Sequence, residues 1–351
     1  MNQSKRRPRH PRIRLVGICL ISVFYVAAIL APFVAPYDYH EQSKRQPSAP
    51  PSLIRFFYKD GNWSIRPFFY AQKLVDTRDL RYEDDESQKF PIYFFVRGSS
   101  YSIIGLFQTD LHFFGTAPSE DGTQTRVNLL GTDQLGRDRF SRLLFAIRFS
   151  LTVAPIGVIL ACILGILFGA LSGYASRGMD ALMMGVADTT IALPTMILIL
   201  AARAAFPLEL PPFSAAAMLI VIFALTGWAE MARLTRGLVL AMRQREFVLA
   251  ARATGVTEAR ILIRHIIPNI ALPLIEQASL MLPVFMLAEI ALSFLGVGLQ
   301  EPEPSLGNML STAGDLTLVR NSPIVILLPA IIIFLFVFAV RLIKWERSQN
   351  I

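Results

Sequence analysis

Long apolar runs divide this chain into six candidate membrane spans. Four of the runs contain no charged residue, and they cover residues 15–35, 149–176, 210–229 and 321–340. Two further runs, 181–202 and 266–299, are interrupted by acidic residues. A helix rises about 1.5 Å per residue, so each run is long enough to cross a hydrocarbon core of about 30 Å. The pattern predicts an all-α polytopic membrane protein with about six transmembrane helices.

The first apolar run follows a basic segment, which indicates its orientation. Its basic residues are Lys5, Arg6, Arg7, Arg9, Arg12 and Arg14, with no acid before Asp38. A cleaved secretory signal is the alternative, but the apolar region of such a signal has only about 7 to 15 residues. Lys and Arg stay on the cytoplasmic side of membranes. We therefore expect residues 1–36 to form a cytoplasmic N-terminus and the first transmembrane helix.

Charge in the later connections agrees with this orientation. If the spans alternate, the connection after the fourth span and the tail 346–351 are cytoplasmic. Residues 233–264 contain seven Arg and two Glu, whereas residues 293–322 contain one Arg and three acids. One segment disagrees, because Arg137, Arg139, Arg142 and Arg148 stand before the second span, on the predicted outer side.

Composition supports the membrane class and excludes several others. The chain is 53% hydrophobic and 17% charged, with a mean hydropathy of +0.48, which is too apolar for an ordinary soluble domain. A net charge of +8 could indicate nucleic acid. The basic residues instead lie at the ends of apolar runs, so we expect no nucleic-acid partner. Two cysteines and four scattered histidines predict neither a disulfide framework nor a metal site.

Residues 37–130 differ in composition from the flanking spans. They include an acidic run at 83–86 and strand-like stretches at 92–96 and 102–107. We expect a small mixed α/β extracytoplasmic insertion, followed by a five-helix transmembrane core over residues 131–345. The sequence favours neither an inert insertion nor an insertion with a function of its own.

The most informative segment is a charged connection between two spans, residues 246–269, EFVLAARATGVTEARILIRHIIPN. Residues 246–253 are good helix formers, and Gly255 suits a helix C-terminus with positive φ. Thr257 can cap a second helix, which we expect Pro268 to end. The segment is thus predicted to be a short helix, a glycine turn and another helix.

This segment resembles the cytoplasmic EAA loop of ABC-importer permeases, which couples the membrane subunit to a separate ATPase. Ala250, Ala251, Gly255 and Pro268 match the pattern, and Glu246 with Phe247 matches the version found in peptide importers. Leu249 replaces the usual Glu. The resemblance implies an ATPase-docking set of Glu246, Phe247, Ala250, Ala251, Arg252, Gly255, Arg260, His265 and Pro268 within loop 246–268. The alternative is an amphipathic interfacial helix without a partner.

Two further stretches resemble the dipeptide and oligopeptide branch of the same family. They are LGTDQLGRDRFSRLLFAIRFSL, residues 130–151, and SFLGVGLQEPEPSLGNML, residues 293–310. The resemblance implies a permease of the bacterial inner membrane, with both termini cytoplasmic. It also implies a second permease subunit, two ATP-binding subunits that hold ATP and Mg, and an extracytoplasmic substrate-binding protein. Membrane lipid would surround the spans, and this chain would bind no cofactor.

Three acidic residues inside the apolar runs are candidates for a role in the transport path. Asp188, Glu276 and Glu289 are weak candidates for lining or gating the path, with Arg177 or Arg252 as expected partners of Asp188. At about 100° per residue, Glu276 and Glu289 do not share one helix face. Acids at span ends, facing water or an arginine, are the alternative.

Missing motifs narrow the function. The sequence contains no GxxxxGK[ST] phosphate-binding loop and none of the motifs GxSxG or HExxH, so we expect no catalytic residue and an energy source on another subunit. An ion-coupled secondary transporter is one competing hypothesis, although no internal repeat is visible. A membrane anchor for an extracytoplasmic receptor domain is the other.

Overall fold

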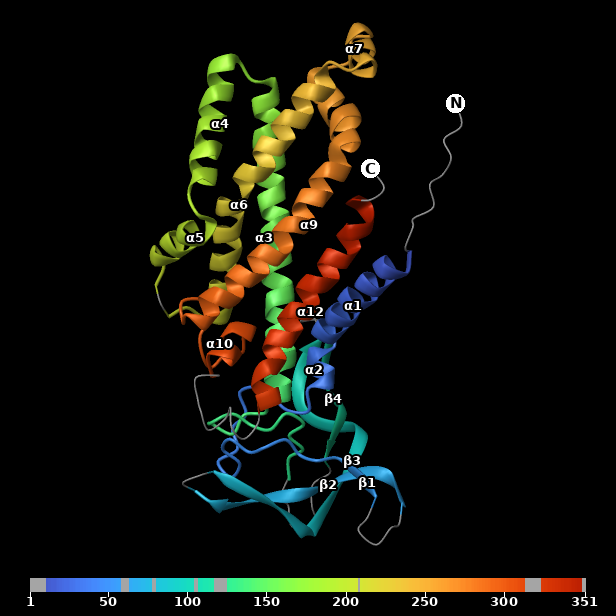
Figure 1. The fold of residues 1–351 in the computed structure, drawn as a ribbon, viewed down its shortest axis with the longest axis vertical. Helices are drawn as coiled ribbons and strands as arrows, with labels where there is room; N and C mark the ends of the chain where they lie inside the picture. Colours follow the sequence, from blue (N-terminus) through green and yellow to red (C-terminus); the bar gives the residue numbers. More distant parts are fainter. Residues whose placement is uncertain are drawn as a thin grey trace. The chain divides into compact units, whose positions relative to one another are not determined.

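The computed structural model describes residues 11–348 except 58–62, 78–79, 104–106, 117–124, 208 and 313–322. The chain forms two compact units, which are described separately (Figure 1). The first unit contains Met1–Ser150 and Ser293–Ile343, and the second contains Leu151–Leu292 and Lys344–Ile351.

Two apolar helices pack together in the first unit, although they come from opposite ends of the chain. Helix α1 (Pro11–Ile29) is followed by the short α2 (Ala31–Val34), and α12 (Pro323–Ser348) closes the described chain. Gly17 lies so close to α12 that a Cβ there would stand 2.9 Å from the carbonyl oxygen of Ala339. The rings of Phe24 and Phe336 meet edge to face at 5.8 Å. The small helix α10 (Leu306–Ser311) also belongs to this unit.

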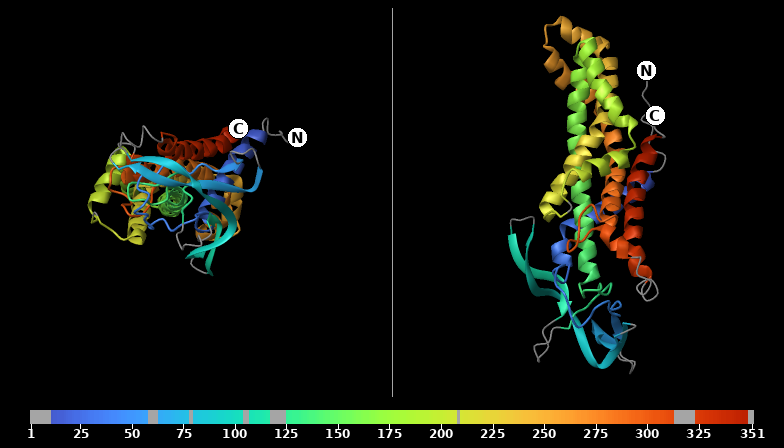
Figure 2. Two further views of the ribbon diagram at one scale, coloured as in Figure 1. Left: turned by 90° about the horizontal axis from the view of Figure 1, so that it is seen from below. Right: turned by 90° about the vertical axis from the view of Figure 1, so that its left-hand side faces the viewer.

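The segment between α2 and α3 forms a four-stranded antiparallel sheet, visible in two views (Figures 1 and 2). The strands follow chain order: β1 (Arg55–Phe57), β2 (Trp63–Asp76), β3 (Arg81–Ile103) and β4 (Phe107–Thr116). The long β3 pairs with β2 through its first half and with β4 through its second. The expected strand at 92–96 lies in β3, whereas 102–107 spans the end of β3 and the start of β4.

This sheet differs from the mixed α/β insertion that we expected. Over 37–130, the described residues form strands, turns and irregular segments but no helix. Antiparallel strands joined in sequence need no helical crossover, because a short turn connects each strand to the next. A core of Phe69, Ile92, Phe114 and Val127 packs under the sheet, and Phe140 at the start of α3 contacts it.

The second unit is helical. Its elements are α3 (Arg139–Tyr174, shared with the first unit), α4 (Arg177–Ala192), α5 (Thr195–Ala204), α6 (Pro212–Arg243), α7 (Glu246–Ala253), α8 (Glu258–Ile261), a π-helical turn η1 (Leu262–Ile266) and α9 (Ile267–Phe294). Glycines set the approach of α3 to α6. A Cβ on Gly165 or Gly169 would lie 2.6 Å or 2.3 Å from a backbone oxygen of α6. Close approach of this kind is how small residues bring membrane helices together.

Among the described residues, three helical segments are long and apolar enough to cross a membrane: Arg139–Tyr174, Pro212–Arg243 and Glu258–Phe294. The expected span 181–202 is instead two helices, α4 and α5, which meet at 96° and count as a fourth span if taken together. Leu193 is extended at this break, as expected before Pro194. The first and last expected spans contain shorter apolar helices, Ile13–Ile29 and Leu327–Ile343. The count of six stays a prediction.

The close contact between α3 and α6 can be tested by adding one methyl group. We expect Gly169→Ala to lower the thermal unfolding midpoint in detergent, because its Cβ collides with the backbone of Ala232. Overpacking of this kind costs about 1–3 kcal/mol. The matched control is Gly237→Ala on α6, where a Cβ meets nothing within 4 Å. If both variants unfold at the same temperature, the close packing at Gly169 is wrong.

Candidate functional site

The segment after α6 folds as the predicted helix, glycine turn and helix. Helix α7 ends where the N–H groups of Gly255 and Val256 donate to the carbonyl oxygens of Arg252 and Ala251, at 3.0 and 3.2 Å. Gly255 has φ +82°, a conformation that costs other residues about 1–2 kcal/mol. Nothing lies within 4 Å of the position of its missing Cβ. Glycine is therefore favoured here by the backbone conformation and not by crowding.

Three aliphatic side chains attach this segment to the second unit. Val248, Ile261 and Ile266 are fully buried, each at 0% exposure. The other face is open, because Glu246, Phe247, Leu249, Ala250, Arg252, Gly255, Arg260 and Pro268 are exposed, while Ala251 and His265 are partly buried. The segment thus presents an exposed face that combines small, apolar and basic residues.

An ion pair links α7 to α8 across the glycine turn. Arg252 donates Nε and Nη2 to the two carboxylate oxygens of Glu258, at 2.5 and 3.0 Å. Hydrogen bonding to Glu258 is the main cause that raises the pKa of Arg252. Because the contact is bidentate, it restrains the angle between the two helices.

Polar contacts also fasten the base of the segment. Arg243, at the end of α6, donates to the carbonyl oxygen of Gly173 at 2.5 Å, and its guanidinium lies 4.5 Å from the ring centre of Tyr174. Arg236 donates twice to Asp180, at 2.6 and 2.5 Å. These contacts join the end of α3, helix α4 and helix α6 beneath the exposed face. Asp180 was not among the predicted residues.

The second half of the segment differs from the prediction at two points. Thr257 has the extended backbone of an N-cap, but its side chain makes no capping hydrogen bond. Pro268 does not end a helix, because α8 continues through η1 into α9. Pro268 therefore stands inside a continuous helix, where it has no N–H to donate to the preceding turn. The π-helical turn just before it shifts the hydrogen-bond register.

The three acids of the apolar runs do not form one site. Asp188 lies 3.4 Å from Arg233, so the expected partners Arg177 and Arg252 were wrong. Asp188 lies on α4 and Arg233 lies on α6, and these two helices pack against each other. Glu289 is fully buried in α9, whereas Glu276 is partly exposed, so the two carboxylates have different surroundings on one helix. Whether any of them lines a path stays a prediction.

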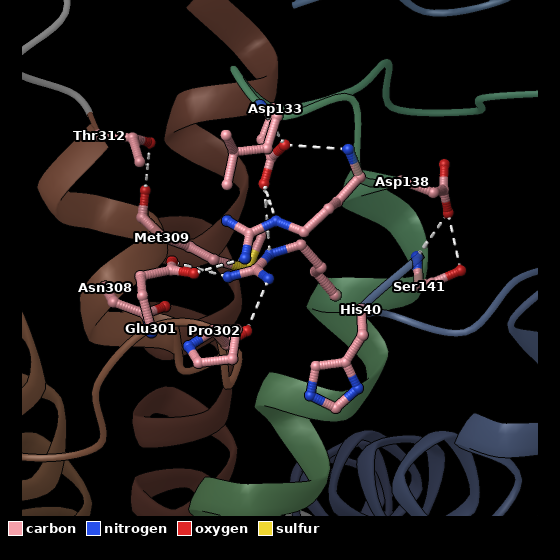
Figure 3. A network of polar contacts seen from close by, with 12 residues as sticks. His40, Asp133, Asp138, Ser141, Glu301, Pro302, Asn308, Met309 and Thr312 are labelled. Carbon is pink, nitrogen blue, oxygen red and sulfur yellow. Dashed lines mark hydrogen bonds and ion pairs between the residues drawn. The ribbon is translucent and has the colours of Figure 1, made fainter. Parts of the chain in front are cut away.

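A polar network in the first unit joins the two stretches that carry the peptide-branch resemblance (Figure 3). Arg137 binds Asp133 at 2.6 Å and Glu301 at 2.7 Å. Arg142 binds the other oxygen of Glu301 at 2.7 Å and the carbonyl oxygen of Pro302 at 2.9 Å. Both arginines are buried, at 5% and 3% exposure. Their charges are therefore neutralised by Asp133 and Glu301 within the fold.

The network borders a cavity of about 350 Å³ in the first unit, lined by residues that include Asp133, Arg139, Asn308, Met309 and Pro329. Asn308 and Ser305 form a capping box at the start of α10. The described residues hold no group of three or more His, Cys, Asp or Glu side chains that could bind a metal.

Asp138 begins helix α3 and is fully enclosed. Its carboxylate accepts hydrogen bonds from the backbone N–H and the hydroxyl of Ser141, both at 2.8 Å (Figure 3). Burial raises the pKa of Asp138 from 3.8 to about 6, against the opposing effect of these hydrogen bonds. The sequence motif Gly-Arg-Asp before an apolar run is the signal that could have identified this cap.

The raised pKa predicts a pH dependence of stability. Because the folded state binds this proton more tightly than the unfolded state, protonation of Asp138 adds to the free energy of unfolding. This contribution is complete below pH 3.8 and is lost as the pH rises to about 6. Asn does not titrate but still accepts the hydrogen bond from Ser141. Relative to the parent, Asp138→Asn should therefore gain up to about 3 kcal/mol between pH 4 and pH 7. Thermal unfolding in detergent across this range measures the change, and a constant difference between the two proteins would contradict the prediction.

Comparison with known proteins adds two family matches. Residues 165–344 match the family described as binding-protein-dependent transport system inner membrane component. Residues 4–51 match the family described as N-terminal TM domain of oligopeptide transport permease C. The first match includes residues 246–269, and the second includes α1 and α2.

Individual relatives agree with these matches. The chain is 37% identical to the di/tripeptide transport system permease protein DppC of Pseudomonas aeruginosa, over 66% of this chain and 73% of that protein. It is 32% identical to the oligopeptide transport system permease protein OppC of Bacillus subtilis, over 54% of this chain and 61% of that protein. Among solved structures, the MetNI methionine ABC transporter in an inward-facing conformation is 17% identical, with a TM-score of 0.44, over 58% of this chain and 96% of that chain.

Proposed function

The chain belongs to the family of binding-protein-dependent transport system inner membrane components, and from this premise we propose that it imports di- or oligopeptides as the permease subunit of an ATP-driven importer. The peptide substrate is supported by the names of the relatives, which are dipeptide, tripeptide and oligopeptide permeases. The observation that carries the proposal is the family match over 165–344, which includes the complete helix–turn–helix segment.

As a member of this family the protein is integral to the bacterial inner membrane. The proposed topology has six spans, with both termini and loop 246–268 in the cytoplasm, and with residues 37–130 outside. The arginine excess of residues 233–264 supports this orientation. In this proposal, residues 1–36 contain the first span, residues 131–345 form the permease core, and residues 346–351 are the tail.

The exposed face of α7 and α8 is the proposed docking surface for the ATPase. It offers Phe247 and Leu249 as apolar contacts, and Ala250 and Gly255 let a partner approach the backbone. Arg252 is held by Glu258, so the turn is stiff enough to transmit a displacement to α6 and α9. Leu249 supplies an apolar contact where related loops carry a carboxylate.

The family implies ATPase and substrate-binding protein partners for this subunit. We propose two ATP-binding subunits, which hold ATP and Mg, and a second homologous permease that completes the path. A substrate-binding protein would deliver peptide from outside. Asp188, Glu276 and Glu289 are proposed to line or gate this path, with Glu276 favoured because it is partly exposed and α9 follows the docking segment.

The docking proposal is tested at Gly255. Val at this position disfavours φ +82° by about 1–2 kcal/mol, so the turn shifts and binding of the ATPase should weaken roughly tenfold. We expect Gly255→Val to reduce ATP-dependent dipeptide uptake and recovery of the ATPase with the purified permease.

The matched control is Gly255→Asn, because Asn tolerates the left-handed conformation far better than Val. We expect the Asn variant to keep most of the uptake and of the bound ATPase. Normal uptake by Gly255→Val, at an equal amount in the membrane, would rule out the docking role.

A further inference from the structure

Four phenylalanines form an exposed aromatic cluster in the first unit. Phe33 comes from α2, Phe94 and Phe95 from β3, and Phe113 from β4. The centres of their rings are 5.6 to 6.3 Å apart in the pairs Phe94–Phe113, Phe33–Phe113, Phe95–Phe113 and Phe33–Phe95. Phe94, Phe95 and Phe113 are nevertheless 55%, 61% and 38% exposed. Rings that pack on one another in this way form one continuous apolar patch and are not isolated surface residues.

The backbone of β3 is distorted to build this cluster. Phe95 has φ +57°, a conformation that is rare for a bulky residue and costs about 1–2 kcal/mol. Side chains of a regular strand alternate between the two faces, so consecutive Phe94 and Phe95 would point apart. Here both contact Phe113. An unfavourable conformation that exposes apolar rings suggests a role outside the fold of the chain itself.

The cluster is attached to the end of a membrane helix. Residues 4–51 match the family of N-terminal transmembrane domains, and α1 exposes apolar side chains along its length, including Leu15, Val23 and Ile29. The ring of His112 on β4 hydrogen-bonds to the carbonyl oxygen of Ala35 at 2.6 Å, which ties the strand to the end of α2. The position of the cluster along the membrane normal is therefore set by α1 and α2.

Helix length places the cluster at the membrane boundary. Arg14 marks the polar end of the apolar run, and Phe33 lies 19 residues further along the chain. These residues run through α1 and, after a break at Leu30, into α2, so at about 1.5 Å per residue they extend at most roughly 28 Å, close to the hydrocarbon thickness of about 30 Å. Phe33 and the rings on it are thus level with the region where acyl chains meet headgroups. Amphipathic elements that lie in this layer bury Trp, Phe and Leu side chains at the boundary of the acyl chains.

We infer that the cluster of Phe33, Phe94, Phe95 and Phe113 inserts into the interfacial layer of the phospholipid bilayer. The sheet then lies against the membrane surface and is not a free domain. We take the occupant of the patch to be lipid, because Phe33, against which Phe95 and Phe113 pack, lies on α2 directly after the exposed apolar side chains of α1. The inference needs α1 to span the membrane, but it needs neither the peptide substrate nor ATPase docking.

Spin labels on single cysteines test this inference. The chain has only two cysteines, so Cys19→Ala and Cys162→Ala give a cysteine-free background. Phe94→Cys and Phe95→Cys place a nitroxide in the cluster, and Ile65→Cys on β2, 92% exposed, is the matched control. The full-length chain, with the subunits that co-purify with it, is reconstituted in phospholipid nanodiscs. Collision rates with oxygen, which concentrates in lipid, and with a nickel chelate, which stays in water, are then measured.

We expect the oxygen-to-nickel collision ratio at positions 94 and 95 to be several-fold higher than at position 65. Equal ratios at the three positions would place the cluster in water. Low collision rates with both reagents would mean that another protein covers it. Either result overturns the proposal. The two cluster positions are independent tests, so the loss of one variant to misfolding leaves the other, and elution as a single peak in size-exclusion chromatography checks each.

Discussion

Charge pairing is the constraint on which the rest of this structure depends. Charged groups at the ends of long apolar helices are costly unless they have partners. In the first unit, Asp133 and Glu301 neutralise Arg137 and Arg142, which joins two segments far apart in the chain. In the second unit, Asp180 binds Arg236 on α6. Each pair satisfies a buried or half-buried charge, and the pairs of Glu301 and Asp180 also join segments far apart in the chain.

Close backbone contact complements these ion pairs. Lipid tails are as apolar as the helix surfaces, so helices in a membrane associate through packing and polar contacts and not through exclusion of water. Gly165 and Gly169 let α3 touch the backbone of α6, and Arg243 closes the end of the same interface on Gly173. These contacts hold helix α6 in place, and α7 and α8 follow at its C-terminal end.

Both proposed functions are located at the ends of helices that these contacts hold in place. The docking segment combines three fully buried anchors with an exposed face, which is the arrangement expected of an element that transmits movement and does not simply cover a surface. At the other end of the chain, the sheet is joined to α2 by His112 and by the aromatic cluster. In both places a small element is attached to the end of an apolar helix.

The sequence by itself determined the membrane class and the glycine turn, because hydropathy and the conformational freedom of Gly255 are local properties. The orientation stays a prediction from the charge bias. The sequence also carried the resemblance that the family matches confirmed. Only the tertiary structure decided which charges pair, for example Asp188 with Arg233 and Arg142 with Glu301. It also decided that residues 181–202 bend by 96° and that strands β1 to β4 form an antiparallel sheet. These features depend on contacts between residues distant in the chain, which no local pattern of hydrophobicity or charge can specify.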